Sequence, residues 1–119
     1  MAKLSKNKKQ YVLQRDKGTC QYCGGLLNIE NVSKWHVDHI VSTKLGGSNE
    51  LSNLLLSCVP CNTRKSGYDL EYFRGMMAIN QSPYKDVINF KQAEKLKSLG
   101  VELDLPKYTF FFEAQSDER

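Results

Sequence analysis

The sequence of 119 residues has no hydrophobic run long enough to cross a membrane. Its longest apolar stretches, at residues 54–56 and 110–112, are far shorter than the roughly 20 residues that a transmembrane helix requires. The first ten residues carry four lysines, but no hydrophobic segment of signal-peptide length follows them. Internal repeats and low-complexity tracts are also missing. We therefore expect a soluble cytoplasmic protein with no membrane partner.

No charge sign dominates the chain, because 17 Lys and Arg stand against 13 Asp and Glu for a net charge of +4. The charge is uneven, however. Residues 1–67 hold ten basic and four acidic side chains, whereas residues 68–119 hold seven and nine. A basic surface favours polyanions, since neutralising phosphates releases counterions from a nucleic acid. The lysines near the N-terminus are equally typical of a solvated tail.

The length is that of one modest domain, and a hydrophobic content of 40% is enough for a small core. This composition excludes wholesale disorder. We predict a single domain over residues 1–119, with a core at about residues 10–67 and a C-terminal extension at about residues 68–119.

The chain has four cysteines, which form two CxxC pairs with none left over: Cys20 with Cys23, and Cys58 with Cys61. In a cytosolic protein such pairs predict a structural zinc site, because four thiolates at about 2.3 Å close the tetrahedral shell of Zn²⁺. Glycines follow the first pair and Pro60 lies inside the second, where tight turns are needed. Disulfide bonds are the alternative that the spacing leaves open.

Periodicity and turn residues predict a ββα unit around the cysteines. We expect a helix at residues 10–17, a strand at 35–41, a polar loop at 44–53, a strand at 54–57 and a helix from about 60 to 67. Beyond it we expect a helix at 68–80, a helix opened by Ser82 and Pro83 and ended at Gly100, and a β-rich segment at 107–113. The predicted class is α+β: a small ββα core stapled by a four-cysteine zinc site, with an α-rich C-terminal extension that ends in the β-rich segment.

The residues able to carry chemistry are concentrated in this unit. They are His36-Val37-Asp38-His39-Ile40, Gly46-Gly47-Ser48-Asn49, Asn53-Leu54, Cys61-Asn62 and Lys65. Their order and spacing resemble the HNH endonucleases, the zinc-bearing branch of the ββα-metal nucleases with a treble-clef-like core. The resemblance covers about residues 20–66. It implies a metal-dependent endonuclease that hydrolyses DNA phosphodiester bonds in a bacterial or phage-infected cell.

The resemblance also implies a role for each catalytic position. His39 matches the general base, because a neutral imidazole can accept a proton from water near neutral pH. Asp38 and Asn62 match the ligands of a catalytic divalent ion, Mg²⁺, Mn²⁺ or Ni²⁺, and Asn53 matches a residue that holds the loop and orients the base. Asp38 and His39 point to opposite faces of an ideal strand. We therefore expect a bulge in the strand, or a phosphate at its edge.

Several positions keep two interpretations. His36 is a candidate additional metal ligand or phosphate contact, although we favour a simple surface histidine. Asn62 also suits a helix N-cap. Candidate DNA contacts are Lys65, Arg64 and Lys44, with a solvated surface as the alternative.

The partner expected from the resemblance is double-stranded DNA. We expect cleavage of one strand or of both, with low sequence specificity. A homodimer or a recruiting protein would help the enzyme to cut both strands. Two other functions stay open: a zinc-stabilised module that binds nucleic acid without cutting it, and a partner-docking subunit of a phage packaging or defence assembly. The phenylalanines at 110–112 either cover the core, which we favour, or form a dimer patch.

Overall fold

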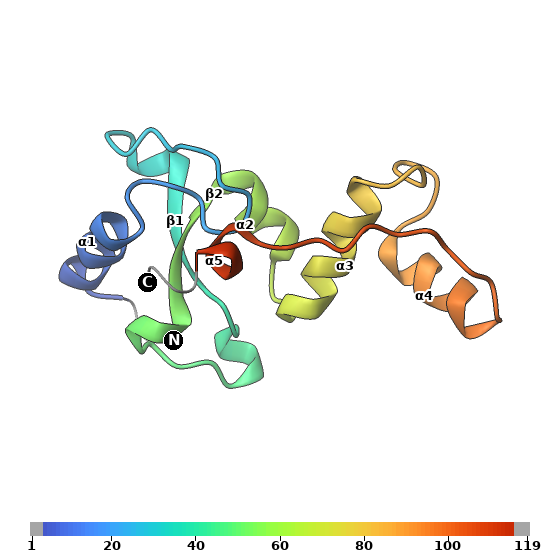
Figure 1. Cartoon of the computed structure of the whole chain (residues 1–119). Coiled ribbons are helices and arrows are strands. Elements are labelled where there is room, and N and C mark those ends of the chain that lie inside the picture. The colour runs from blue at the N-terminus through green and yellow to red at the C-terminus, as the bar shows by residue number, and fades with distance from the viewer. Residues whose placement is uncertain (1–3, 116–119) are drawn as a thin grey trace. The chain divides into compact units, whose positions relative to one another are not determined.

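The computed structural model describes residues 4–115, which divide into two compact units (Figure 1). The first unit combines the described residues of Met1–Asp69 with those of Phe110–Arg119, and the second is Leu70–Thr109. In sequence, the second unit is therefore inserted between two parts of the first. Among the described residues, no helix is both long and apolar enough to span a membrane.

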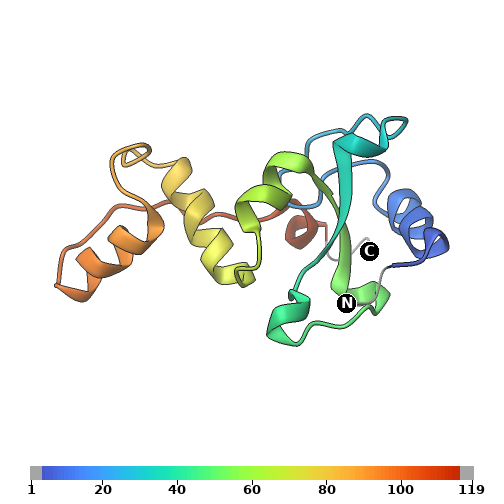
Figure 2. The ribbon, with the colours of Figure 1, turned by 180° about the vertical axis from the view of Figure 1, so that it is seen from behind.

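The first unit is built on a two-stranded antiparallel sheet. Helix α1 (Lys6–Arg15) precedes strand β1 (Trp35–His39), and strand β2 (Leu54–Cys58) runs directly into helix α2 (Val59–Lys65), as Figure 2 shows from behind. A short helix α5 (Phe111–Ala114) completes the unit. The predicted mixed fold with a small ββα core is confirmed.

The core of the first unit lies between α1 and the sheet. Val12 and Leu13 of α1 pack against Trp35 of β1 and against Leu54 and Leu56 of β2. Burying one such aliphatic side chain contributes about 1.5–3 kcal/mol to stability. Leu55 and Ser57, which alternate with these residues along β2, are also fully buried, so both faces of that strand are covered.

The outer edge of β2 is closed by the end of α1 and by the segment after it. The Leu56 amide donates to Asp16 Oδ2 at 2.9 Å, and the Leu56 carbonyl accepts from the Gln21 amide at 2.8 Å. Arg15 donates to the Leu54 carbonyl at 2.6 Å. An edge strand with satisfied backbone groups does not recruit another strand, and these bonds fix the chain that leads into the first cysteine pair.

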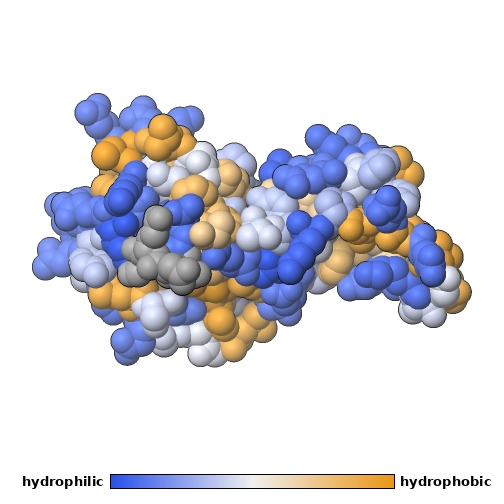
Figure 3. Space-filling model, viewed as in Figure 1, coloured by the Kyte–Doolittle hydropathy of each residue, from blue (hydrophilic) through white to orange (hydrophobic). Residues whose placement is uncertain are grey.

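The second unit is a helical pair, α3 (Leu70–Asn80) packed on α4 (Phe90–Ser98). Gly75 lets the helices meet, because a Cβ there would lie 2.0 Å from a carbon of the Phe90 ring. The Tyr72 and Phe90 rings meet edge to face at 5.0 Å. Hydrophobic residues are visible at the surface of both units in Figure 3, and the second unit exposes Val87, Leu99 and Val101.

Two predicted elements are corrected by the structure. The helix expected to open at Ser82 begins only at Phe90, because Asn89 and Gln92 form a reciprocal capping box there. The predicted β-rich segment at 107–113 is also wrong. No strand is described in it, and Glu113 accepts the Phe110 amide at 2.9 Å to close the first turn of α5.

Candidate active site and metal centre

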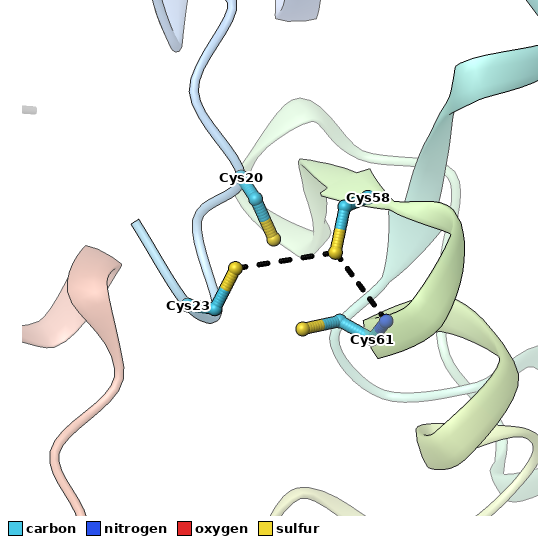
Figure 4. A group of neighbouring side chains, drawn as sticks. All are labelled: Cys20, Cys23, Cys58 and Cys61. Atoms are coloured by element: carbon cyan, nitrogen blue, oxygen red, sulfur yellow. Dashed lines mark hydrogen bonds between the residues drawn. The ribbon is translucent and has the colours of Figure 1, made fainter. Parts of the chain in front are cut away.

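Four sulfur atoms converge in the first unit (Figure 4). The Sγ atoms of Cys20, Cys23, Cys58 and Cys61 all lie within 4.8 Å of one another, and those of Cys23 and Cys58 are 3.9 Å apart. A tetrahedron with Zn–S bonds of about 2.3 Å has edges of about 3.8 Å. The same distance is far longer than a disulfide of about 2.05 Å, and all four cysteines are free. They are positioned to bind a metal ion, and their spacing fits zinc.

Local turns aim these sulfurs. Gly24 adopts a left-handed conformation (φ +81°), and its amide donates to the Cys20 carbonyl at 2.8 Å. In the second pair, Cys58 is the N-cap of α2 and its Sγ accepts from the Cys61 amide at 3.4 Å. The signals expected from the sequence, glycine after one pair and proline inside the other, are thus the residues that shape the two turns.

The close packing of the sulfurs changes their acidity. Hydrogen bonds from Cys23 and Cys61 lower the pKa of Cys20, whereas burial raises the pKa of Cys58 to about 11. Four sulfurs this close cannot all be thiolates without a cation between them. Metal binding therefore displaces protons from the cluster.

Asp38 lies in β1 with one carboxylate oxygen fully engaged. Tyr22 Oη donates to Asp38 Oδ2 at 2.6 Å, and Lys65 Nζ lies 3.3 Å from the same oxygen. Burial above all, and then the charge of Asp38, raise the pKa of Tyr22, so its hydroxyl keeps the proton that it donates.

The other oxygen of Asp38, Oδ1, is open. Among the described residues, none makes a hydrogen bond with it, and no buried side-chain oxygen or nitrogen is without a partner. Oδ1 must therefore reach the surface, which agrees with a side chain that is 14% exposed. One oxygen of Asp38 is fixed and the other can accept a ligand.

Lys65 does not occupy the position predicted for it. Its side chain is 1% exposed, and its ammonium donates to the His39 carbonyl at 2.9 Å besides contacting Asp38. A buried cation held in this way cannot grip a phosphate at the surface, so the prediction of a DNA contact at Lys65 is wrong. Arg64 and Lys44 are exposed, as such a contact requires.

Asn62 lies one turn before Lys65 on α2, which places both residues on the same face of the helix. That helix packs against β1, and the Lys65 side chain reaches Asp38. Cys58 is the N-cap of α2, so the alternative role of Asn62 as an N-cap is excluded. The Asn62 side chain is partly exposed, and none of the described residues makes a hydrogen bond with it. Carboxylate and amide oxygens are donor types that suit Mg²⁺ and Mn²⁺, and Asp38 and Asn62 supply one of each.

His39 ends β1 with its ring half-buried. Its Nε2 lies 2.7 Å from Asn49 Oδ1, and the Asn49 carbonyl in turn accepts from Lys8 Nζ at 2.6 Å. A carbonyl oxygen on Nε2 selects the tautomer with a proton there and leaves Nδ1 free to accept one. The loop therefore sets which ring nitrogen can act as a base.

Asn53 holds that loop to the end of the strand. Its Nδ2 donates to the Val41 carbonyl at 3.0 Å and to the Ser48 carbonyl at 2.8 Å, while its Oδ1 accepts from the Val41 amide at 2.9 Å. Gly47 makes this approach possible, because a Cβ there would lie 1.7 Å from the Val41 oxygen. These are the contacts expected of a residue that positions the loop around His39.

The bulge expected in the strand is not there. The strands pair one to one, with Asp38 opposite Leu55 and His39 opposite Leu54. The two side chains therefore leave opposite faces of a regular strand. Without a bulge, Asp38 and His39 can serve one site only if the phosphate lies at the edge of the sheet, which is the other arrangement that we expected.

His36 stands apart from these groups. It is exposed and, with Lys6, Lys9 and Trp35, lines a surface pocket of about 310 Å³. Within the described part of the chain, the four cysteines are the only group of three or more Cys, His, Asp or Glu close enough to share an ion. The structure thus gives His36 no partner ligand of these types.

Residues 20–67 match the family model of the HNH endonucleases. This part of the chain is similar to an HNH domain. The match includes both cysteine pairs, Asp38, His39, Asn53 and Asn62, and it supports a nuclease-type function that acts on nucleic acid. Among curated proteins, no sequence matches the chain.

Two residues of the candidate site have roles that the sequence did not predict: Tyr22, and Asn49, which belongs to the motif but was given no function there. Each lies inside a motif that the sequence displays, Tyr22 between the first two cysteines and Asn49 in the loop after the glycine pair. Their positions in those motifs are the signal that was available. Which way their side chains point depends on contacts with β1, which no spacing in the sequence reveals.

Proposed function

We propose that the HNH domain is a metal-dependent endonuclease that hydrolyses phosphodiester bonds of DNA, with Asp38 and Asn62 as ligands of the catalytic ion and His39 as the general base. The observation that carries this proposal is the asymmetry of Asp38. Tyr22 and Lys65 occupy one of its oxygens and the other is left open, while Asn62 lies on the same face of α2 as Lys65.

When bound, Mg²⁺, Mn²⁺ or Ni²⁺ supplies charge stabilisation for the scissile phosphate. The side chains do the rest. Asp38 and Asn62 would hold the ion near the edge of the sheet, and Nδ1 of His39 removes a proton from the attacking water. Asn49 holds the ring in that tautomer. Attack on phosphorus breaks the bond to the 3′ oxygen, which takes a proton from solvent, and leaves a 5′ phosphate and a 3′ hydroxyl.

The proposed substrate is double-stranded DNA, read through its backbone. Arg64 and Lys44 are exposed in the same unit as the site, where cations bind flanking phosphates without distinguishing bases. Low sequence specificity follows. Cleavage of both strands then requires two encounters, a second copy of the chain or a protein that recruits it.

The decisive experiment follows the nicking of supercoiled plasmid by the full chain with Mg²⁺, Mn²⁺ or Ni²⁺, with EDTA as the metal control. We expect His39→Ala to lower the rate by about 10²–10⁴, the usual contribution of a general base. His36→Ala is the matched control. It changes an exposed histidine of the same strand, and this variant should cut DNA at the parent rate. DNA binding without nicking in any metal would instead support the non-cleaving module.

A further inference from the structure

We propose that Tyr22 is a positioning residue for the catalytic ion and that it links the zinc-binding turn to Asp38. Its hydroxyl holds Oδ2 of Asp38, so that Oδ1 stays directed toward the ion. This inference rests on the proposed function of Asp38 as a ligand. It assigns a second role to the cysteine pair, which then supports the active site as well as the fold.

The backbone of Tyr22 is fixed from both sides. It lies between Cys20 and Cys23, whose sulfurs both belong to the four-cysteine cluster. The preceding residue, Gln21, donates its amide to the Leu56 carbonyl of β2 at 2.8 Å. The turn is therefore attached to the sheet that carries Asp38, and zinc binding holds the turn in shape.

The ring of Tyr22 is fixed as well. It is fully buried, with Phe110 packed edge to face at 5.5 Å and Phe112 at 6.3 Å. The amide of Phe111 donates to the Tyr22 carbonyl at 3.1 Å. A buried ring in such contact has little freedom to turn, so the position of its hydroxyl is fixed.

The hydroxyl of Tyr22 contacts Oδ2 of Asp38. At 2.6 Å the bond has the length of a strong hydrogen bond from a hydroxyl to a carboxylate. Lys65 approaches the same oxygen at 3.3 Å, so two donors converge on one atom and the carboxylate cannot rotate without losing both. Groups that orient a metal ligand in this way typically change metal affinity by about 10–100-fold when they are removed.

The test compares direct binding of Mn²⁺ to the zinc-loaded full chain, measured from the electron paramagnetic resonance signal of free Mn²⁺. Tyr22→Phe keeps the ring and removes only the hydroxyl. We expect the dissociation constant for Mn²⁺ to rise by about 10–100-fold, with zinc content unchanged at one per chain. Tyr11→Phe, which removes an exposed hydroxyl from α1, is the matched control and should bind Mn²⁺ as the parent does.

Asp38→Asn separates failure of this inference from failure of the proposed function. If Asp38→Asn abolishes Mn²⁺ binding while Tyr22→Phe stays within twofold of the parent, the role of Tyr22 is refuted and the ion site stands. If Asp38→Asn binds Mn²⁺ normally, the ion site itself is wrong. Should Tyr22→Phe lose its zinc, Phe112→Leu decides instead, because it loosens the ring but keeps the hydroxyl. We expect a several-fold weaker affinity there, and an unchanged affinity would overturn the proposal.

Discussion

His39 shows how much a single side chain depends on its neighbour. The proposed base needs a free ring nitrogen that faces water, and Asn49 Oδ1 lies 2.7 Å from the opposite nitrogen. Asn49 is itself held by Lys8, which belongs to α1 and lies far away in sequence. The sequence identified His39 by its motif. It could not assign a role to Asn49 or Lys8, because their roles arise only when the loop folds back over the strand.

This dependence predicts the outcome of changing Asn49. Asn49→Ala should lower the rate of plasmid nicking about tenfold, a small share of what a general base contributes, because the ring loses its orientation and preferred tautomer. Asn49→Asp keeps an oxygen acceptor and should restore most of the rate. Asn28→Ala, an exposed asparagine elsewhere in the first unit, is the control. Equal rates for the alanine and aspartate variants would show that the acceptor has no part in orienting His39.

At the scale of elements, the sequence predicted best those whose signals are local. Strand β2 and helix α2 lie within two residues of expectation, because the leucine run, the cysteines and Pro60 are neighbours in sequence. Helix α5 is not predicted, because Phe110 finds its partner, Tyr22, in a distant part of the chain. The predicted bulge was wrong for a similar reason: the regular register is set by contacts across the sheet.

The loop between the strands allows a sharp test at this scale. Gly47→Ala should destabilise the fold by more than about 3 kcal/mol, because its Cβ would overlap the Val41 carbonyl oxygen. Gly46→Ala meets no atom within 4 Å but must adopt φ +90°, so we expect a cost of only about 1–2 kcal/mol. Chemical denaturation of both variants measures the difference, and equal stabilities would contradict this packing of the loop.

Across the whole molecule, the excess of positive charge lies in the same part of the sequence as the residues able to carry chemistry. The segment with the basic excess contains the metal centre and the candidate catalytic residues, whereas residues 68–119 are slightly acidic. The function of the second unit could not be predicted from its sequence, because its apolar residues mainly serve the packing of α3 on α4.

The proposed DNA contacts predict a specific dependence on salt. Affinity for a DNA duplex should fall steeply as salt rises, and Arg64→Ala and Lys44→Ala should each reduce the slope of log affinity against log salt by about 1. Lys97→Ala, in the second unit, is the matched loss of an exposed cation and should leave the slope unchanged. Binding titrations at several salt concentrations measure these slopes. If the slope falls equally in all three variants, DNA affinity depends only on the net charge of the chain and not on contacts at Arg64 and Lys44.

The return of the chain at Phe110 has a consequence for the order of folding. The aromatic contacts that hold Tyr22 come from residues that follow the second unit, so that whole unit is synthesised before them. Contacts between distant parts of a chain form late, since a long loop must close first. On the ribosome, the cysteine turn and the strands emerge early, but the support for Tyr22 arrives only after the helical pair. A nascent chain that has not yet passed Phe112 therefore carries the motif without a finished site, and we expect the proposed cutting activity to be acquired late in synthesis.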